Sequence, residues 1–178
     1  PDAMEWYNEP AEWSESDDRL TVSVEGDTDV WRHTLHDFVA DDAHFYNREV
    51  SGDFTATVKL VGEYTEQYDQ AGLMVREDET TWLKCGVELL DGVQQAGAVI
   101  TRDVSDWSVL PLGSDPESVW IRAERIGAAV EVSYSLDGES FTLLRQGYLS
   151  EAETLRVGQM AAAPQGDGFE VTFEDFSV

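Results

Sequence analysis

Lysine is scarce in this chain of 178 residues, which contains only Lys59 and Lys84. Lysine and arginine together number 11 against 37 aspartates and glutamates, so the formal net charge is -26. A chain so poor in basic residues has no patch that could neutralise a phosphate backbone, and this excludes nucleic-acid binding. The acids are spread along the sequence and do not form a block, which disfavours a dedicated surface for a basic partner.

So large a negative charge predicts adaptation to salt. At low ionic strength the acidic groups repel one another and weaken the folded state. Molar salt shortens the Debye length to about 3 Å and screens most of this repulsion. We therefore expect the protein to work in salt-rich surroundings, and we predict a salt-rich cytoplasm as its location.

Cysteine and long apolar runs are also rare. Cys85 is the only cysteine, so no disulfide can form within the chain. Its place among alternating apolar residues favours a small buried side chain over a nucleophile. No run of about 18 apolar residues occurs, so we expect no membrane-spanning segment.

Sequence signatures of cofactor and metal sites are missing. The three histidines, His33, His36 and His44, do not have the spacing of a zinc site. Glycine-rich phosphate loops and the G-x-S-x-G nucleophile elbow are absent as well. We therefore expect no cofactor and no metal site. A structural calcium ion in the acid-rich loops is the one exception left open.

Apolar and polar residues alternate along most of the chain, with the period of a β-strand. The turn sequences Asp91-Gly92 and Asp137-Gly138 are typical of hairpins. A short helix is expected only near residues 36–44. Strands so closely spaced, without helices between them, predict an all-β sandwich or jelly roll, with a closed barrel as the alternative. The expected strands span residues 19–26, 53–62, 71–78, 81–90, 96–104, 118–127, 129–138, 139–147, 155–163 and 168–178.

No linker divides the chain, so we expect one domain over residues 1–178, with residues 1–15 packed along a sheet edge. Four motifs then follow in order: YDQAG from residue 68, W-x-K-x-G-x-E from Trp82, SDWS from residue 105 and YSLDG from residue 134. Together they resemble the DUF1349 family, also called "regulation of enolase"-like proteins, over residues 5–178. This family is similar to the concanavalin A-like lectin/glucanase superfamily, which implies a jelly-roll sandwich of two antiparallel sheets.

The strand over residues 81–90 has two unlike faces. Leu83, Cys85 and Val87 lie on one side, whereas Lys84 and Glu88 lie on the other. If this strand shares a sheet with segments 71–78 and 118–127, the non-core face carries tryptophans among charged groups. The residues that we expect to contact a ligand on this face and its loops are Arg32, His44, Asp69, Gln70, Arg76, Trp82, Lys84, Glu88, Asp106, Trp107, Trp120 and Arg122.

Such a face suits a carbohydrate or another small polar ligand, because tryptophan rings stack on sugars while polar groups bind hydroxyls. Non-catalytic binding on the concave sheet face is therefore our prediction. An outer face covered by the N-terminal segment, with Lys84 and Glu88 as a structural ion pair, is the simpler alternative. No partner beyond such a ligand is predicted, and the oligomeric state stays open.

Two further function classes remain. One is an enzyme acting on glycosides or sugar derivatives. The E-x-D-x-E spacing of the superfamily's retaining glucanases is missing, so no catalytic residue is predicted, although carboxylates from different strands could still meet. The other class is a regulatory interaction domain, which only the family name suggests.

Overall fold

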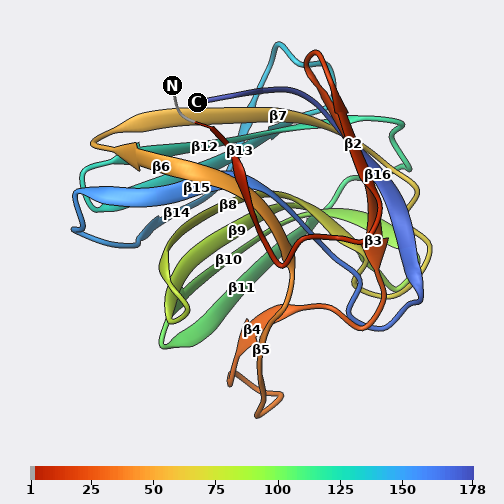
Figure 1. Ribbon diagram of the computed structural model, residues 1–178, viewed down its shortest axis with the longest axis horizontal. Helices are drawn as coiled ribbons and strands as arrows, with labels where there is room; N and C mark the ends of the chain where they lie inside the picture. The colour runs from red at the N-terminus through yellow and green to blue at the C-terminus, as the bar shows by residue number, and fades with distance from the viewer. Residues whose placement is uncertain (1–2) are drawn as a thin grey trace.

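The computed structural model describes residues 3–178, and every regular element in that range is a β-strand (Figure 1). The strands form two seven-stranded sheets and one two-stranded hairpin. In spatial order, the first sheet contains β1 (Glu5–Tyr7), β6 (His44–Ser51), β15 (Thr154–Ala162), β8 (Gln70–Asp78), β9 (Thr81–Leu90), β10 (Val93–Arg102) and β11 (Val104–Pro111). The second sheet contains β14 (Thr142–Tyr148), β13 (Ala129–Ser135), β12 (Val119–Ile126), β7 (Phe54–Gly62), β16 (Gly168–Ser177), β3 (Arg19–Glu25) and β2 (Trp13–Ser16).

The main core lies between the two sheets. Each central strand turns every second side chain inward, so that Leu73 and Leu83 of the first sheet meet Val58 and Ile121 of the second. These four side chains are fully buried. Truncating one of them to alanine would cost about 2–5 kcal/mol of folding free energy. The prediction of an all-β, two-sheet antiparallel sandwich is confirmed.

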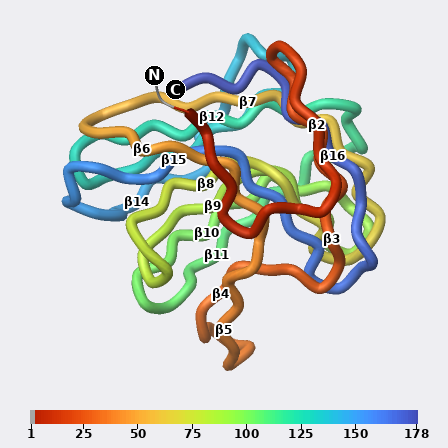
Figure 2. Tube along the Cα trace, in the orientation of Figure 1, coloured from red at the N-terminus to blue at the C-terminus, as the bar shows by residue number. Residues whose placement is uncertain are grey.

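The N-terminal segment contributes an edge strand to each sheet. β1 pairs with β6 in the first sheet, and β2 pairs with β3 in the second. Between them, the Trp6 ring packs 5.4 Å from Trp13 and 4.7 Å from Tyr46, measured between ring centroids. Residues 1 and 2 of the expected N-terminal segment lie outside the described residues. Residues 5–16 run from an edge of the first sheet, at β1, to an edge of the second sheet, at β2 (Figure 2).

A small hairpin stands where a helix was expected near residues 36–44. β4 (Val30–Arg32) pairs with β5 (Val39–Asp41), and β6 begins at His44. The connecting turn has positive φ at His33, Leu35 and Asp37, which a helix cannot accommodate. The helix prediction is therefore wrong. We refer to β4, β5 and their turn as the β4–β5 hairpin.

The β4–β5 hairpin covers part of the outer face of the first sheet and hangs below it in Figure 1. Beneath it lies a second apolar cluster, in which Trp31 and Val30 of the hairpin pack with Trp82, Met74 and Phe45 of the sheet. The outer face is therefore partly a core of its own. Among residues 3–178, no helix is long and apolar enough to cross a membrane.

Candidate functional site

Strands β8 and β9 bring four polar or charged side chains to the outer face of the first sheet. In their antiparallel register, Gln70 lies opposite Glu88, and Arg76 lies opposite Trp82. Lys84 lies between these pairs, opposite Met74. Since alternate residues of a strand share a face, the charged side predicted from the spacing of residues 81–90 is present.

A pocket of about 290 Å³ lies between this outer face and the β4–β5 hairpin, and we call it the outer-face pocket. A smaller cavity of about 20 Å³ continues from it toward the sheet backbone at Gly86 and Gly97. The residues that line the outer-face pocket are Asp29, Trp31, His36, Phe38, Tyr68, Gln70, Lys84, Glu88, Val99, Trp107, Pro164 and Gln165.

The polar floor of the pocket is one hydrogen-bonded chain. Lys84 Nζ donates to Gln70 Oε1 and to the carbonyl oxygen of Val30, each at 2.8 Å. Gln70 Nε2 donates to Glu88 Oε2 at 3.4 Å, and Trp107 Nε1 donates to Glu88 Oε1 at 3.0 Å. The network orients the Glu88 carboxylate from both sides.

The charges of the floor are unevenly compensated. Lys84 lies 3.6 Å from Asp29 Oδ1, which makes Asp29 its ion-pair partner. The direct ion pair between Lys84 and Glu88, which the simpler alternative assumed, is therefore wrong, because Gln70 lies between the two side chains and bonds both. Burial raises the pKa of Glu88, and the nearby Lys84 charge and the Trp107 hydrogen bond lower it by less. The neighbours of Glu88 therefore do not fully offset the cost of burying its negative charge.

Aromatic side chains form two walls above this floor. On the hairpin side, the Trp31 and His36 rings lie 5.8 Å apart, and His36 lies 6.2 Å from Phe38. On the opposite side, Tyr68 and Trp107 lie 6.4 Å apart with their planes at 75°. The pocket therefore combines flat apolar surfaces with a polar floor, an arrangement that recognises small polar molecules with apolar faces.

Glycines lie in the strands that form the floor of the pocket, where the backbones of neighbouring strands approach closely. A Cβ at Gly72 would lie 1.8 Å from the Cys85 carbonyl oxygen, and one at Gly86 would lie 2.0 Å from that of Ala71. Both positions therefore require glycine. Gly97 is different, because its nearest neighbours would be 3.6 Å from an added Cβ, at ordinary contact distance. An alanine at position 97 would narrow the smaller cavity without strain.

The family model described as "Protein of unknown function (DUF1349)" matches residues 6–178. The chain belongs to this family. It is 34% identical over 173 residues to "Regulation of enolase protein 1" of Saccharomyces cerevisiae, covering 97% of this chain and 87% of the yeast protein. The crystal structure of a functionally unknown protein from Saccharomyces cerevisiae superposes with a TM-score of 0.94 at 34% identity, over 98% of this chain and 94% of that one. The family resemblance is confirmed.

Two more distant structures share the fold of this DUF1349 protein. A xylan beta-1,4-xylosidase from Bacillus halodurans superposes with a TM-score of 0.68 at 14% identity, over 89% of this chain but 32% of that chain. The carbohydrate binding module CBM66 from Bacillus subtilis superposes with a TM-score of 0.62 at 12% identity, over 96% of this chain and 92% of that one. At these identities the likeness shows the sandwich alone, and it agrees with a concanavalin A-like fold.

Four of the twelve expected ligand residues line the pocket of this DUF1349 protein: Gln70, Lys84, Glu88 and Trp107. Trp82 faces the correct side of its strand but is completely buried under the β4–β5 hairpin, so it has no surface on which a ligand could stack.

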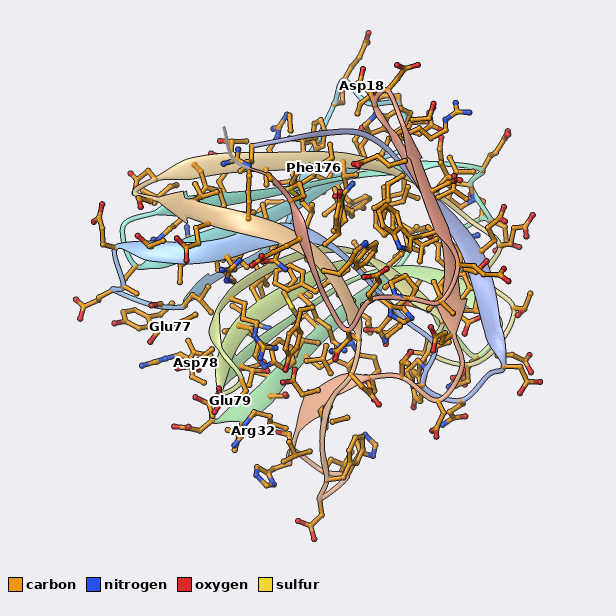
Figure 3. All side chains as sticks on the ribbon, viewed as in Figure 1. Asp18, Arg32, Glu77, Asp78, Glu79 and Phe176 are labelled. Carbon is orange, nitrogen blue, oxygen red and sulfur yellow. The ribbon has the colours of Figure 1, made fainter. Side chains whose placement is uncertain are left out.

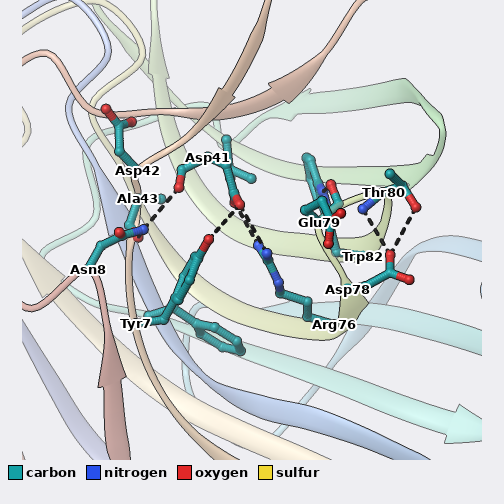
Figure 4. A network of polar contacts seen from close by, with 12 residues as sticks. Tyr7, Asn8, Asp41, Asp42, Ala43, Arg76, Asp78, Glu79, Thr80 and Trp82 are labelled. Atoms are coloured by element: carbon teal, nitrogen blue, oxygen red, sulfur yellow. Dashed lines mark hydrogen bonds and ion pairs between the residues drawn. The ribbon is translucent and has the colours of Figure 1, made fainter.

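Arg76 also lies on the outer face but holds the hairpin in place. Its guanidinium makes a two-pronged contact with Asp41, at 2.6 and 3.0 Å, and lies 4.6 Å over the Tyr7 ring (Figure 4). Tyr7 Oη donates to the same carboxylate at 2.7 Å, and Asn8 Nδ2 bonds the carbonyl oxygens of Asp41 and Ala43 (Figure 4). This cluster ties β1, β5 and β8 together.

Three other expected ligand residues serve the framework of loops and strand ends. His44 is buried between the Asn8 carbonyl oxygen and the Glu25 amide. Asp69 is fully buried and accepts hydrogen bonds from the backbone amides of residues 65 and 66. Arg32 is the last residue of β4 and donates to the Asp103 carbonyl oxygen, and it is not part of the pocket lining (Figure 3).

The remaining three expected residues lie elsewhere. Asp106 does not line the pocket; it pairs with Arg145 of β14 at 3.1 Å. Trp120 and Arg122 belong to β12, which pairs with β7 and β13 in the second sheet. The expectation that segment 118–127 shares a sheet with segments 71–78 and 81–90 is therefore wrong.

Most of the pocket wall was not anticipated from the sequence. Asp29, His36 and Phe38 come from the β4–β5 hairpin and the residue before it, and Tyr68 comes from the loop before β8. Their signal was a concentration of aromatic residues in segments with weak strand character. Among residues 3–178, no group of three or more His, Cys, Asp or Glu side chains is arranged to hold a metal ion.

Proposed function

We propose that this protein binds a carbohydrate in the outer-face pocket without converting it chemically. The observation that carries the proposal is the combination of two aromatic walls with the Gln70–Glu88 floor. Sugars present apolar ring faces and a rim of hydroxyl groups, and these match stacked rings and fixed polar groups respectively. A volume of about 290 Å³ is close to the lower end of the usual range for small-molecule pockets, about 300 Å³.

Within the pocket, Trp107 is the best candidate for a stacking surface. The residue is 36% exposed, and its indole N–H donates to Glu88, so the ring is accessible and fixed in orientation. Lys84 has a more structural role, because its bonds to Val30 and Gln70 join the hairpin to the sheet. Ligand contacts are therefore assigned mainly to Trp107, Glu88 and the hairpin aromatics.

The names of the distant structures agree with this proposal. CBM66 is a carbohydrate binding module of nearly the same extent as this chain, and the xylosidase is named for its action on a polysaccharide. The proposal itself rests on the geometry of the pocket, since the same sandwich can serve many functions.

A saccharide panel in high salt tests the proposal. Calorimetry or thermal shift against neutral mono- and oligosaccharides should identify at least one ligand. Trp107→Ala, which removes the indole ring from the wall that it forms with Tyr68 and also removes one Glu88 hydrogen bond, should abolish that response. Trp120→Ala on the second sheet is the matched control and should bind normally. The proposal fails if no saccharide binds, or if both variants lose binding equally.

One observation favours an enzyme as the second candidate. Burial raises the pKa of Glu88, the property required of a general acid, and a second carboxylate, Asp29, lines the same pocket. If the protein hydrolyses glycosides, Glu88→Gln should abolish turnover and leave ligand binding in place. A panel of chromogenic glycosides that yields no Glu88-dependent product would leave binding as the sole activity.

We also propose that the protein is adapted to salt-rich surroundings and functions in a salt-rich cytoplasm. Acidic side chains project into solvent at separate places on the molecule, including Asp18 at one end and the run Glu77, Asp78 and Glu79 at another (Figure 3). Dispersed charges of one sign favour solubility in concentrated salt while their mutual repulsion is screened.

A further inference from the structure

The hydrogen-bond donors in the pocket floor are already used by the protein. Two protons of Lys84 Nζ go to Val30 and Gln70, and its charge lies beside Asp29. The Gln70 amide donates to the Tyr68 carbonyl oxygen and to Glu88. The Trp107 indole donates to Glu88, and the Trp31 indole donates to a backbone carbonyl. The Gln70 amide and the two indoles therefore have no donor left for a ligand, and the third Lys84 proton belongs to an ammonium group that is already paired with Asp29 at 3.6 Å.

Acceptor capacity, in contrast, is left over. A carboxylate has about four lone-pair positions, and Glu88 receives one protein hydrogen bond at each oxygen. Asp29 adds a second carboxylate to the lining, against the single positive charge of Lys84. The lining therefore carries a formal excess of one negative charge, in a chain whose net charge is -26.

The walls suit a positive charge as well as a sugar face. Trp31, Phe38, Tyr68 and Trp107 all line the pocket, and aromatic faces attract cations through their ring quadrupoles. The raised pKa of Glu88 points the same way, because it reports a carboxylate whose burial is not fully compensated by its neighbours. A cationic group on the ligand would supply the missing compensation.

We propose that the outer-face pocket prefers sugars carrying a protonated amine over their neutral or N-acetylated counterparts. This inference rests on the carbohydrate-binding function proposed above and specifies its ligand class. The amine would donate to the free lone pairs of Glu88 between the aromatic walls. Anionic sugars would be rejected, because Asp29 and Glu88 outweigh the single charge of Lys84 and repel theirs.

Three β-1,4-linked tetrasaccharides with different C2 substituents test the preference: the chitosan tetramer (amine), the chitin tetramer (acetamide) and cellotetraose (hydroxyl). Affinities are measured by calorimetry in high salt, at a pH where Glu88 is ionised and the amine is protonated. We expect the chitosan tetramer to bind about tenfold more tightly than the other two, because its ammonium group adds a Coulombic attraction to the Glu88 carboxylate that a neutral hydroxyl or acetamide lacks.

Glu88→Gln should remove this preference while leaving some neutral binding. Glu170→Gln is the matched control, since Glu170 is an exposed acid on β16 of the second sheet, and it should keep the preference. Asp29→Asn is a second pocket variant and should reduce the preference in the same direction.

The outcomes distinguish this inference from the function beneath it. Equal binding of the three tetramers, or binding of none while another saccharide of the panel binds, overturns the amine preference alone. A preference that survives in Glu88→Gln also overturns it, because general attraction to the acidic surface would then be responsible. If no saccharide of any kind binds, the carbohydrate-binding function fails together with the inference.

Discussion

The two lysines of the chain offer a sharp test of what the structure assigns to each. Lys84 is buried, with a side chain 7% exposed, and bonds Gln70 and the Val30 carbonyl oxygen. Lys59 lies on the second sheet with a side chain 27% exposed, 3.7 Å from Glu174. Replacing either lysine by methionine keeps an unbranched side chain and removes one positive charge. The two variants therefore differ mainly in the hydrogen bonds and ion pairs that the replaced ammonium group made.

Lys84→Met should destabilise the fold strongly. The change leaves the Val30 oxygen, Gln70 Oε1 and the Asp29 carboxylate without their shared donor. Each buried acceptor without a partner costs about 1–3 kcal/mol, and breaking a buried charged network costs about 3–5 kcal/mol. Because Asp29 is partly exposed, we expect about 3 kcal/mol, which lowers the melting temperature of a chain this long by about 6–12 °C.

Lys59→Met should cost less than about 1 kcal/mol, the usual range for an exposed ion pair. Urea unfolding followed by circular dichroism, at one fixed high salt concentration, measures both values. Amide hydrogen exchange should also accelerate in the β4–β5 hairpin of Lys84→Met alone, since Lys84, unlike Lys59, joins that hairpin to the sheet. If the two variants lose equal stability, or if hairpin exchange is unchanged in Lys84→Met, the structural role assigned to Lys84 is refuted.

Four other predictions follow from the same structure. Because the pKa of Glu88 is raised in the folded protein, protonation of this carboxyl stabilises the fold below its ordinary pKa of 4.5, and this contribution is lost as pH rises through the folded pKa. Glu88→Gln has no such loss, so its free energy of unfolding should increase relative to that of the wild type as pH rises through this window. Urea unfolding at a series of pH values measures the difference. Gly97→Ala should change the free energy of unfolding by less than about 1 kcal/mol. It should weaken the binding of any ligand that enters the smaller cavity, and an unchanged affinity in calorimetry would show that the ligand does not reach this cavity. Burial raises the pKa of the Cys85 thiol to about 12, so a thiol reagent at neutral pH should label the protein only after denaturant unfolds it. The melting temperature should rise as sodium chloride is raised from about 0.1 to 1 M, because salt screens the repulsion among the charges that make up the net charge of -26. An unchanged melting temperature would contradict the proposal that the protein is adapted to salt.

Alternation along a strand was a reliable guide to which side of the sheet a residue occupies. Leu83 and Val87 are buried in the main core, and Lys84 and Glu88 lie on the outer face, as their spacing predicts. The Asp91-Gly92 turn was also predictable, because positive φ at both residues fits the two-residue hairpin between β9 and β10. These features depend on backbone geometry over a few residues.

Strand pairing was less predictable. The same alternation places Trp120 and Arg122 on a non-core face, but their strand β12 pairs with β7, so this face belongs to the other sheet. Trp82 shows a second limit. Its spacing correctly puts it on the outer face, yet it is completely buried because the β4–β5 hairpin folds over it. Exposure depends on what else covers the face.

The sequence by itself determined the β class, the two faces of β8 and β9, and the acidic surface. The scarcity of lysine in the chain also drew attention to Lys84. Only the tertiary structure decided that these faces make a pocket. The Lys84–Val30 bond spans 54 positions of sequence, and the Trp107 bond to Glu88 spans 19. Periodicity records how each strand is pleated, whereas a pocket arises where separate segments meet. That meeting depends on packing energies summed over the whole sandwich.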